Sequence, residues 1–116
     1  MKVKVMDAIK LLELLGFPKA QQNERSGFCL LALLDLREKD SWAFSKNPLS
    51  GITPIMKFVE KEYGKKYAPN TRETFRRQTM HQFVQAGIVQ YNPDKPSRPV
   101  NSLSNRETYV KSYKNL

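Results

Sequence analysis

The stretch that decides the fold runs from Asn70 to Gly87 and reads NTRETFRRQTMHQFVQAG. Its apolar residues recur three and four positions apart, which is the spacing of one face of an α-helix. Asn70 stands three residues before Glu73, as in a capping box, and Gly87 is a typical helix stop. The stretch therefore predicts a single helix over Asn70–Ala86. The residues expected on its core side are Phe75, Thr79, Phe83 and Ala86, flanked by Met80.

The opposite side of this predicted helix is polar and poor in acid, with Glu73 as its one carboxylate. A merely solvated face remains the alternative, but such faces usually mix Glu with Lys. Here arginine, threonine, asparagine and glutamine prevail, and these side chains match the hydrogen-bonding groups of base edges in the DNA major groove. The helix therefore predicts contacts with double-stranded DNA, chiefly from its N-terminal part. The candidate residues on it are Asn70, Thr71, Arg72, Thr74, Arg76, Arg77, Gln78 and His81.

Some of these candidates have a second interpretation. Arg72 and Arg76 project nearer the core side, so each is expected to contact either a phosphate or an intramolecular partner such as Glu73. His81 lies in the far half of the helix and is expected beside solvent or a phosphate rather than as a catalytic base. Outside the helix, basic residues in the preceding turn are expected on phosphates, and those in the predicted hairpin on a neighbouring DNA backbone or in the minor groove. They are Lys65, Lys66, Lys95 and Arg98.

A shorter helix precedes the deciding stretch. Thr53 is its expected N-cap, Pro54 fills the first helical position, and Gly64 ends it. The turn Lys65–Pro69 then leads into Asn70, so residues 54–86 predict a helix–turn–helix. After Gly87, residues 88–91 alternate as a strand, residues 92–96 are rich in turn formers, and residues 108–110 are expected to form the returning strand. Residues 88–111 would then form a wing.

The N-terminal part of the chain is expected to supply the rest of the core. Val3–Leu15 predicts one helix and Gln22–Leu36 a second, which is almost wholly apolar in its middle and is therefore buried. Trp42 and Phe44 are expected to anchor the polar loop that follows. Residues 1–116 thus predict a single domain, mainly α, with a winged helix-turn-helix fold and a small C-terminal β-hairpin.

The charge of the chain is strongly positive and unevenly placed. Lys and Arg number 20 against 11 Asp and Glu, which gives a formal net charge of +9. Residues 51–116 hold 12 basic and 5 acidic side chains, so +7 of this excess lies in the second part. Because a basic side chain that neutralises a phosphate releases a condensed counterion, this imbalance favours a polyanionic partner.

The chain offers few residues for catalysis. With one histidine and one cysteine, Cys29, which is expected in the core, no nucleophile–base pair or zinc site is evident. A Mg²⁺-dependent nuclease needs converging carboxylates and a nearby lysine. Asp94 is followed by Glu107, but Glu107 lacks the lysine two positions later. We therefore expect no enzyme activity, no catalytic or metal-binding residue and no cofactor within these residues.

Targeting signals are also missing from the sequence. The longest apolar run, Phe28–Leu34, is far shorter than the roughly 20 residues that span a bilayer. The N-terminus alternates Lys with Val and Met and lacks the apolar region of a signal peptide. We expect no membrane contact and a cytoplasmic protein.

Several stretches resemble one known family. They are Gln21–Ser26, Leu30–Leu36, Asn47–Leu49, Gly51–Met56 and Tyr67–Thr74, followed by Arg76–Thr79, His81–Phe83, Tyr91–Pro93 and Arg98–Ser102. In these residues the chain is similar to the N-terminal helix-turn-helix domain of the BsuBI/PstI type II restriction endonucleases. The resemblance implies a DNA-binding module of an enzyme that cuts a short palindromic duplex with Mg²⁺. It places the Mg²⁺ and the cleavage in a nuclease domain that follows this one, and that domain is then an expected partner.

Two other functions remain open from the residues themselves. One is a stand-alone winged-helix transcription regulator, a homodimer formed through Val3–Leu15. The other is a protein-interaction module that uses the same fold to dock a nuclease domain or a modification partner.

Overall fold

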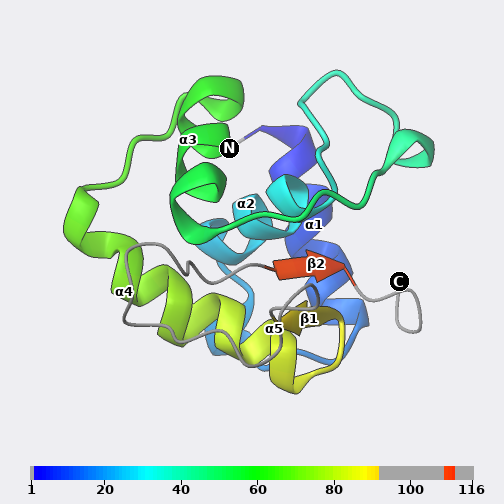
Figure 1. The fold of residues 1–116 in the computed structure, drawn as a ribbon. Helices are drawn as coiled ribbons and strands as arrows, with labels where there is room; N and C mark the ends of the chain where they lie inside the picture. Colours follow the sequence, from blue (N-terminus) through cyan, green and yellow to red (C-terminus); the bar gives the residue numbers. More distant parts are fainter. Residues whose placement is uncertain (1, 92–108, 112–116) are drawn as a thin grey trace.

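The computed structural model describes residues 2–91 and 109–111 of the chain, and Figure 1 shows their arrangement. Within these residues, helices make up most of the fold, and one small sheet lies beside them. The α-helices are α1 Val3–Leu14, α2 Glu24–Leu33, α3 Ile52–Tyr63, α4 Arg72–Thr74 and α5 His81–Gln85; a π-helical segment, Phe75–Met80, joins the last two. The strands are β1 Val89–Tyr91 and β2 Tyr109–Lys111, and single 3₁₀ turns form at Lys19–Gln21, Trp42–Phe44 and Pro69–Thr71.

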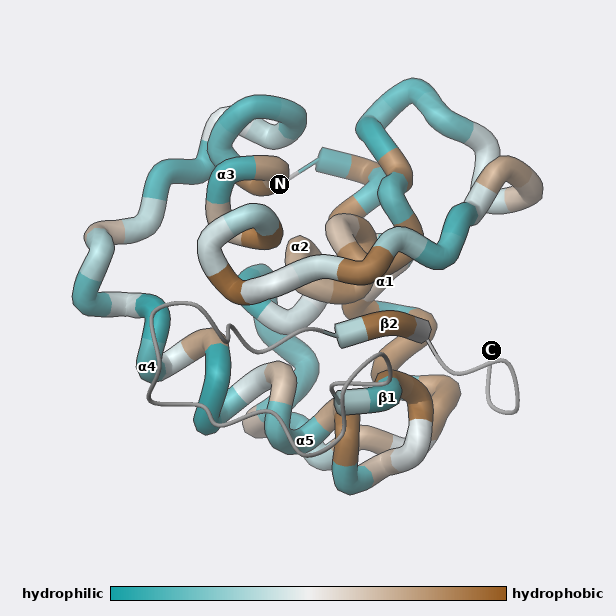
Figure 2. Tube along the Cα trace, in the orientation of Figure 1, coloured by the Kyte–Doolittle hydropathy of each residue, from teal (hydrophilic) through white to brown (hydrophobic). Residues whose placement is uncertain are grey.

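Helix α2 is the centre of the core, as its apolar sequence predicts. Every residue from Ser26 to Leu34 is buried, and α1, α3, the π-helical segment and β2 all pack against α2. Figure 2 shows the apolar centre of the molecule in brown. Helix α1 crosses α2 closely at Gly27: a Cβ added there would lie 3.0 Å from Cγ2 of Val5 and 3.2 Å from its backbone oxygen, so a larger residue would force α1 to shift.

The bounds of α2 differ slightly from the predicted Gln22–Leu36. Asn23 caps the helix, because its side chain accepts a hydrogen bond from the backbone N–H of Ser26 at 2.8 Å. The helix ends at Leu33, and Asp35 adopts a positive φ of 53°. The side chain of Cys29 is fully buried, as predicted, and burial raises the pKa of its thiol far above the ordinary value.

Helix α3 begins earlier than predicted. Its N-cap is Gly51 and its first residue is Ile52, so Thr53 is not the cap and Pro54 is the third helical residue. The entry of the chain is fixed by Ser50, which forms two backbone hydrogen bonds with Tyr109 of β2, at 2.9 and 2.7 Å. The predicted stop at Gly64 is confirmed, with φ +70° and its N–H bonded to Glu60 O at 3.0 Å.

The deciding stretch is helical, but it is not one uniform α-helix. It opens with the 3₁₀ turn at Pro69 and continues through α4, the π-helical segment and α5. After its predicted role, we call Arg72–Gln85 the recognition helix. The predicted capping box is wrong: no side chain caps α4, and the carboxylate of Glu73 instead binds arginines one turn later. A guanidinium offers that carboxylate charged donors, which make stronger hydrogen bonds than a backbone N–H.

The predicted core side of the recognition helix is confirmed at four of its five positions. Phe75, Thr79, Met80 and Phe83 are fully buried, whereas Ala86 is exposed. A π-helix has more residues per turn than an α-helix, so the segment rotates later positions away from the face that α-helical spacing predicts. The chain also turns at once after Ala86, where Gly87 has φ +80°.

The hairpin lies beside α5 at the end of the described chain. Strands β1 and β2 are antiparallel, with Val89 opposite Lys111, Gln90 opposite Val110 and Tyr91 opposite Tyr109. The mainly α fold with a small C-terminal hairpin is therefore confirmed. Residues 92–108, which include the predicted DNA contacts Lys95 and Arg98, lie outside the described residues.

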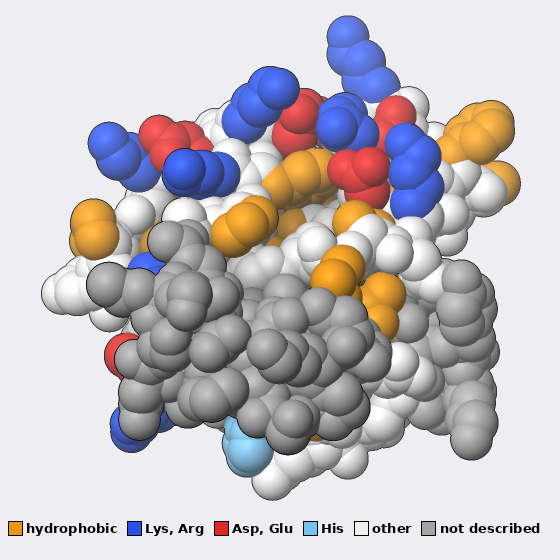
Figure 3. Space-filling view, in the orientation of Figure 1, with side chains coloured by type: hydrophobic (Ala, Val, Ile, Leu, Met, Phe, Trp, Pro, Cys, Tyr) orange, Lys and Arg blue, Asp and Glu red, His pale blue; other side chains and the backbone are white. Residues whose placement is uncertain are grey.

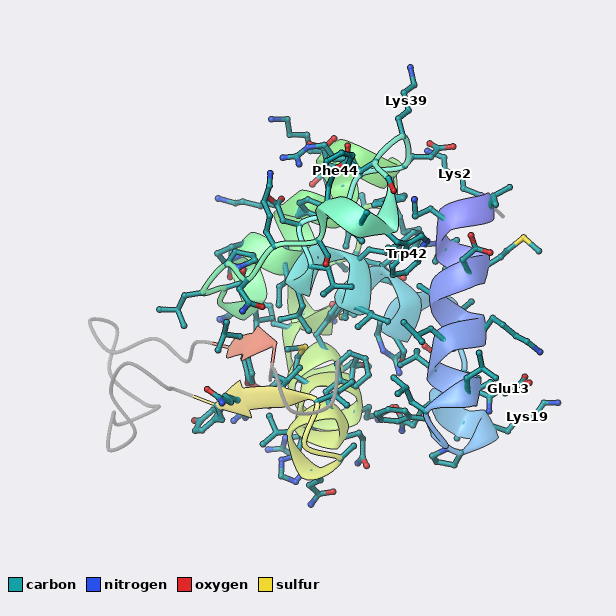
Figure 4. All side chains as sticks on the ribbon, turned by 90° about the vertical axis from the view of Figure 1, so that its right-hand side faces the viewer. Lys2, Glu13, Lys19, Lys39, Trp42 and Phe44 are labelled. Carbon is teal, nitrogen blue, oxygen red and sulfur yellow. The ribbon has the colours of Figure 1, made fainter. Side chains whose placement is uncertain are left out.

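Of the two aromatic residues predicted to anchor the loop before α3 to the core, only one does so. Trp42 packs against the core beside α1, where Nζ of Lys4 lies 5.4 Å from the centre of its ring (Figure 4). Phe44 is 71% exposed, so its predicted anchoring role is wrong. Residues of a 3₁₀ turn point about 120° apart, and Phe44 therefore cannot share the direction of Trp42.

Candidate nucleic-acid interface

The predicted DNA-contacting residues fall on the outer side of the recognition helix and its preceding turn. Of these, the exposed ones are Asn70, Arg72, Arg77, Gln78 and His81, with Lys65 and Lys66 exposed in the turn; Thr71, Thr74 and Arg76 are half-buried. The apolar side faces α2 and the described strands of the hairpin, and none of the described elements packs over the polar side.

Glu73 joins the two central arginines of this surface. Its Oε1 accepts from Nε of Arg76 at 3.2 Å, and its Oε2 accepts from Nη2 of Arg76 at 2.7 Å and from Nε of Arg77 at 3.1 Å. The hydrogen bond from Arg76 is the main reason why the pKa of Glu73 lies below its ordinary value, and both guanidinium charges add to it.

The geometry separates the arginines that the sequence left ambiguous. Arg76 has the intramolecular partner that was one of its two alternatives. Arg72 has no ion-pair partner among residues 2–91 and 109–111, so a phosphate contact remains its predicted role. The side chain of Arg77 is 75% exposed, against 32% for that of Arg76, and it binds Glu73 through Nε alone.

The turn between α3 and the recognition helix is held in place by aromatic and charged contacts. The ring of Tyr67 meets that of Phe75 edge-on at 5.0 Å, and Nζ of Lys65 lies 5.5 Å from the Tyr67 ring. Lys65 also pairs with Glu24 of α2 at 3.7 Å. Burial, and then the charge of Glu24, raises the pKa of Tyr67 to about 12. The turn thus connects the start of the recognition helix to the core helix.

One residue of this arrangement was missed by the sequence analysis. Arg25, in the first turn of α2, donates from Nε to Oγ1 of Thr79 at 2.9 Å. Thr79 is fully buried, and a buried hydroxyl requires a hydrogen-bonding partner. The placement of Thr79 on the core side therefore predicted a hydrogen-bonding partner for its hydroxyl, although nothing local identified Arg25.

The recognition helix and the hairpin share one face of the molecule. A hollow of about 440 Å³ lies between them, lined by Arg76, Arg77, His81, Val84, Tyr91 and Tyr109. At the rim, Nε2 of His81 lies 3.1 Å from Nε2 of Gln85. The predicted arginines and histidine are therefore brought together with the described part of the wing.

Two classes of site find no support in the described residues. Among residues 2–91 and 109–111, no three His, Cys, Asp or Glu side chains lie close enough together to hold a metal ion. In the same residues, no helix is both long and apolar enough to cross a membrane.

The fold and this surface define a helix-turn-helix domain with a small hairpin. The chain belongs to the BsuBI/PstI restriction endonuclease HTH domain family, whose model matches residues 2–114. It is 61% identical over 102 residues to the type II restriction enzyme BsuBI of Bacillus subtilis, covering 88% of this chain and 32% of that enzyme. It is 40% identical over 98 residues to the type II restriction enzyme AplI of Arthrospira platensis, covering 84% and 30%.

A solved structure shares the whole fold. The SdaI restriction endonuclease superposes with a TM-score of 0.88 at 35% sequence identity, covering 98% of this chain and 35% of that one. The chain thus spans about a third of the length of the restriction enzymes that it matches.

Proposed function

We propose that this chain is the double-stranded DNA-binding module of a type II restriction endonuclease, with the recognition helix in the major groove. The observation that carries the proposal is the polar side of that helix, which holds Arg72, Arg76 and Arg77 with Glu73 as its single acid. Arginine pairs with guanine, and asparagine or glutamine with adenine, through two hydrogen bonds in the major groove. Phosphate contacts from Lys65 and Lys66 would fix the orientation.

Cleavage belongs, in this proposal, to the part of the enzyme that the chain does not cover. The matched relatives are type II restriction enzymes about three times as long as the match. We infer that the Mg²⁺-dependent step takes place in such a nuclease domain, which is also the module's expected partner in the cytoplasm. The module itself supplies binding and position.

Fluorescence anisotropy of the 116-residue chain with a labelled duplex of random sequence, measured at two salt concentrations, tests the proposal. The logarithm of the binding constant should fall with the logarithm of salt concentration, by about 0.9 for each phosphate neutralised. Binding that is absent at low salt, or that does not change with salt, would contradict the proposal. Selection from a pool of duplexes with a randomised centre would then identify the preferred sequence.

A role in protein contact is the alternative that one observation favours. Val3, Met6 and Leu14 lie on one side of α1 and are 72%, 52% and 73% exposed. Such a stripe suits a second copy of the chain or a docked domain. Analytical ultracentrifugation of the wild type and of Leu14→Lys tests whether a second copy of the chain binds this stripe. A dimer that Leu14→Lys disrupts would support the homodimer, whereas a wild-type monomer would argue against it.

A further inference from the structure

Glu73 occupies an unusual place for an acid in a surface that we propose to bind DNA. It is the one carboxylate in the sequence between Glu62 and Asp94, and it lies in the first turn of α4 among the candidate contacts. A carboxylate there repels phosphates, so it weakens any binding that rests on charge alone. A contribution of Glu73 to binding must therefore offset this repulsion.

The three hydrogen bonds of Glu73 hold the two arginines differently. Arg76 lies side-on, with both its Nε and its Nη2 engaged by the carboxylate. Arg77 is bound at Nε only, and within the described residues neither of its terminal amino groups has a hydrogen-bond partner. Those two groups form the fork that matches O6 and N7 of a guanine.

Stabilisation of the fold does not account for this arrangement. Glu73 and Arg77 are 59% and 75% exposed, and exposed pairs three or four residues apart in a helix contribute little to folding. Orientation is the larger effect. An exposed arginine loses side-chain entropy when it binds, and holding it at Nε beforehand reduces that loss.

We propose that Glu73 is a positioning residue that gives the module its sequence selectivity. It orients the terminal amino groups of Arg77 for one base and disfavours plain phosphate contact by the same guanidinium. This inference rests on the proposed DNA-binding function. Selectivity arises from both effects together, because one improves the correct contact and the other penalises the incorrect one.

Glu73→Gln tests the proposal, with two duplexes as probes: one of random sequence and one that carries the sequence preferred by the wild type. The variant should bind the random duplex about 3- to 10-fold more tightly, with a salt dependence steeper by about one phosphate equivalent. Its preference for the selected duplex should fall about 10-fold. Glu73→Asp keeps the charge but shortens the reach, so it should lose preference without gaining affinity for the random duplex.

Glu13→Gln is the matched control. It removes the same charge from an exposed glutamate that pairs with Lys10 at 3.1 Å and points away from the molecule on α1 (Figure 4). It should leave the preference unchanged. If Glu73→Gln keeps the wild-type preference, or weakens binding to both duplexes equally, the positioning role is overturned. If the wild type binds neither duplex, the DNA-binding function itself fails, which is a separate and earlier result.

Discussion

Two charged surfaces of this domain are built in opposite ways. One, which we call the end cluster, lies over α3 and the loop that follows α2, where Figure 3 shows acidic and basic side chains interleaved. Arg37 there contacts Asp35, Asp40 and Glu62 at 3.4, 3.9 and 3.2 Å. The members of the end cluster are Lys2, Asp35, Arg37, Glu38, Asp40, Lys46 and Glu62.

The other surface is the polar side of the recognition helix, where Arg76 and Arg77 share the carboxylate of Glu73 and Arg72 has no ion-pair partner among the described residues. In the end cluster each basic member has an acidic partner within the domain. On the recognition helix, positive charge and hydrogen-bond donors remain in excess. The comparison indicates that the net charge of the chain does not by itself locate a surface that binds an anionic partner. Such a surface is better indicated by basic side chains that outnumber their acidic neighbours.

The largest effect should come from the buried side of the recognition helix. Phe75→Ala should lower the free energy of unfolding by about 3–5 kcal/mol, because it opens a cavity beneath the helix. Gln78→Ala, exposed on the same helix, should change it by no more than about 0.5 kcal/mol. Urea denaturation followed by circular dichroism measures both. Equal effects would mean that the two sides of the helix are not assigned correctly.

The exposed side should instead control binding. Arg77→Ala should weaken binding to the preferred duplex by about 1–3 kcal/mol and relax selectivity at one base pair. Anisotropy titration measures the loss, and selection from the randomised pool measures the selectivity. Uniform weakening on every duplex would make Arg77 a phosphate contact, and no weakening would remove it from the interface.

The end cluster should show the reverse pattern. Arg37→Ala should leave DNA affinity unchanged and lower the free energy of unfolding by about 1 kcal/mol, because its three ion pairs are partly exposed and each contributes little. Thermal unfolding and anisotropy on the same sample give both values. A loss of DNA affinity comparable to that of Arg77→Ala would remove the distinction between the two surfaces.

The smallest effect concerns pH. The folded pKa of Glu73 lies below its ordinary value of 4.5, so its stabilising contribution is present above that value and is lost as pH falls through the folded pKa. Thermal unfolding of wild type and Glu73→Gln should therefore differ slightly near neutral pH and converge in acid. A difference that grows as pH falls would have the wrong sign.

The sequence predicted much of the fold because its signals are local. The spacing of apolar residues located α1, α2 and the buried face of the recognition helix, and Gly64 marked the end of α3. The predicted start of α3 was wrong because a strand distant in the sequence, β2, pairs with the residue before its cap. Gly51 replaced Thr53 as the cap of α3 because Ser50 is paired with Tyr109, which lies 59 positions later in the numbering.

In the candidate site, too, features with a local sequence signal were predicted and features that depend on distant contacts were not. The position of each residue on the predicted helix indicated which side chains are exposed. It did not decide whether Arg76 contacts a phosphate or Glu73, because both partners lie within reach of that position. The hydrogen bond from Arg25 to Thr79 joins residues 54 positions apart and has no local signal.

By itself, the sequence determined the order of the helices, the identity of the core helix and the excess of positive charge in the second part of the chain. These follow from composition and from periodicity over a few residues. Only the tertiary structure decided that the recognition helix contains a π-helical segment and that Glu73 binds Arg76 and Arg77. It also placed the described part of the hairpin beside those arginines. Each of these depends on side-chain geometry or on packing between distant segments, which no local pattern records.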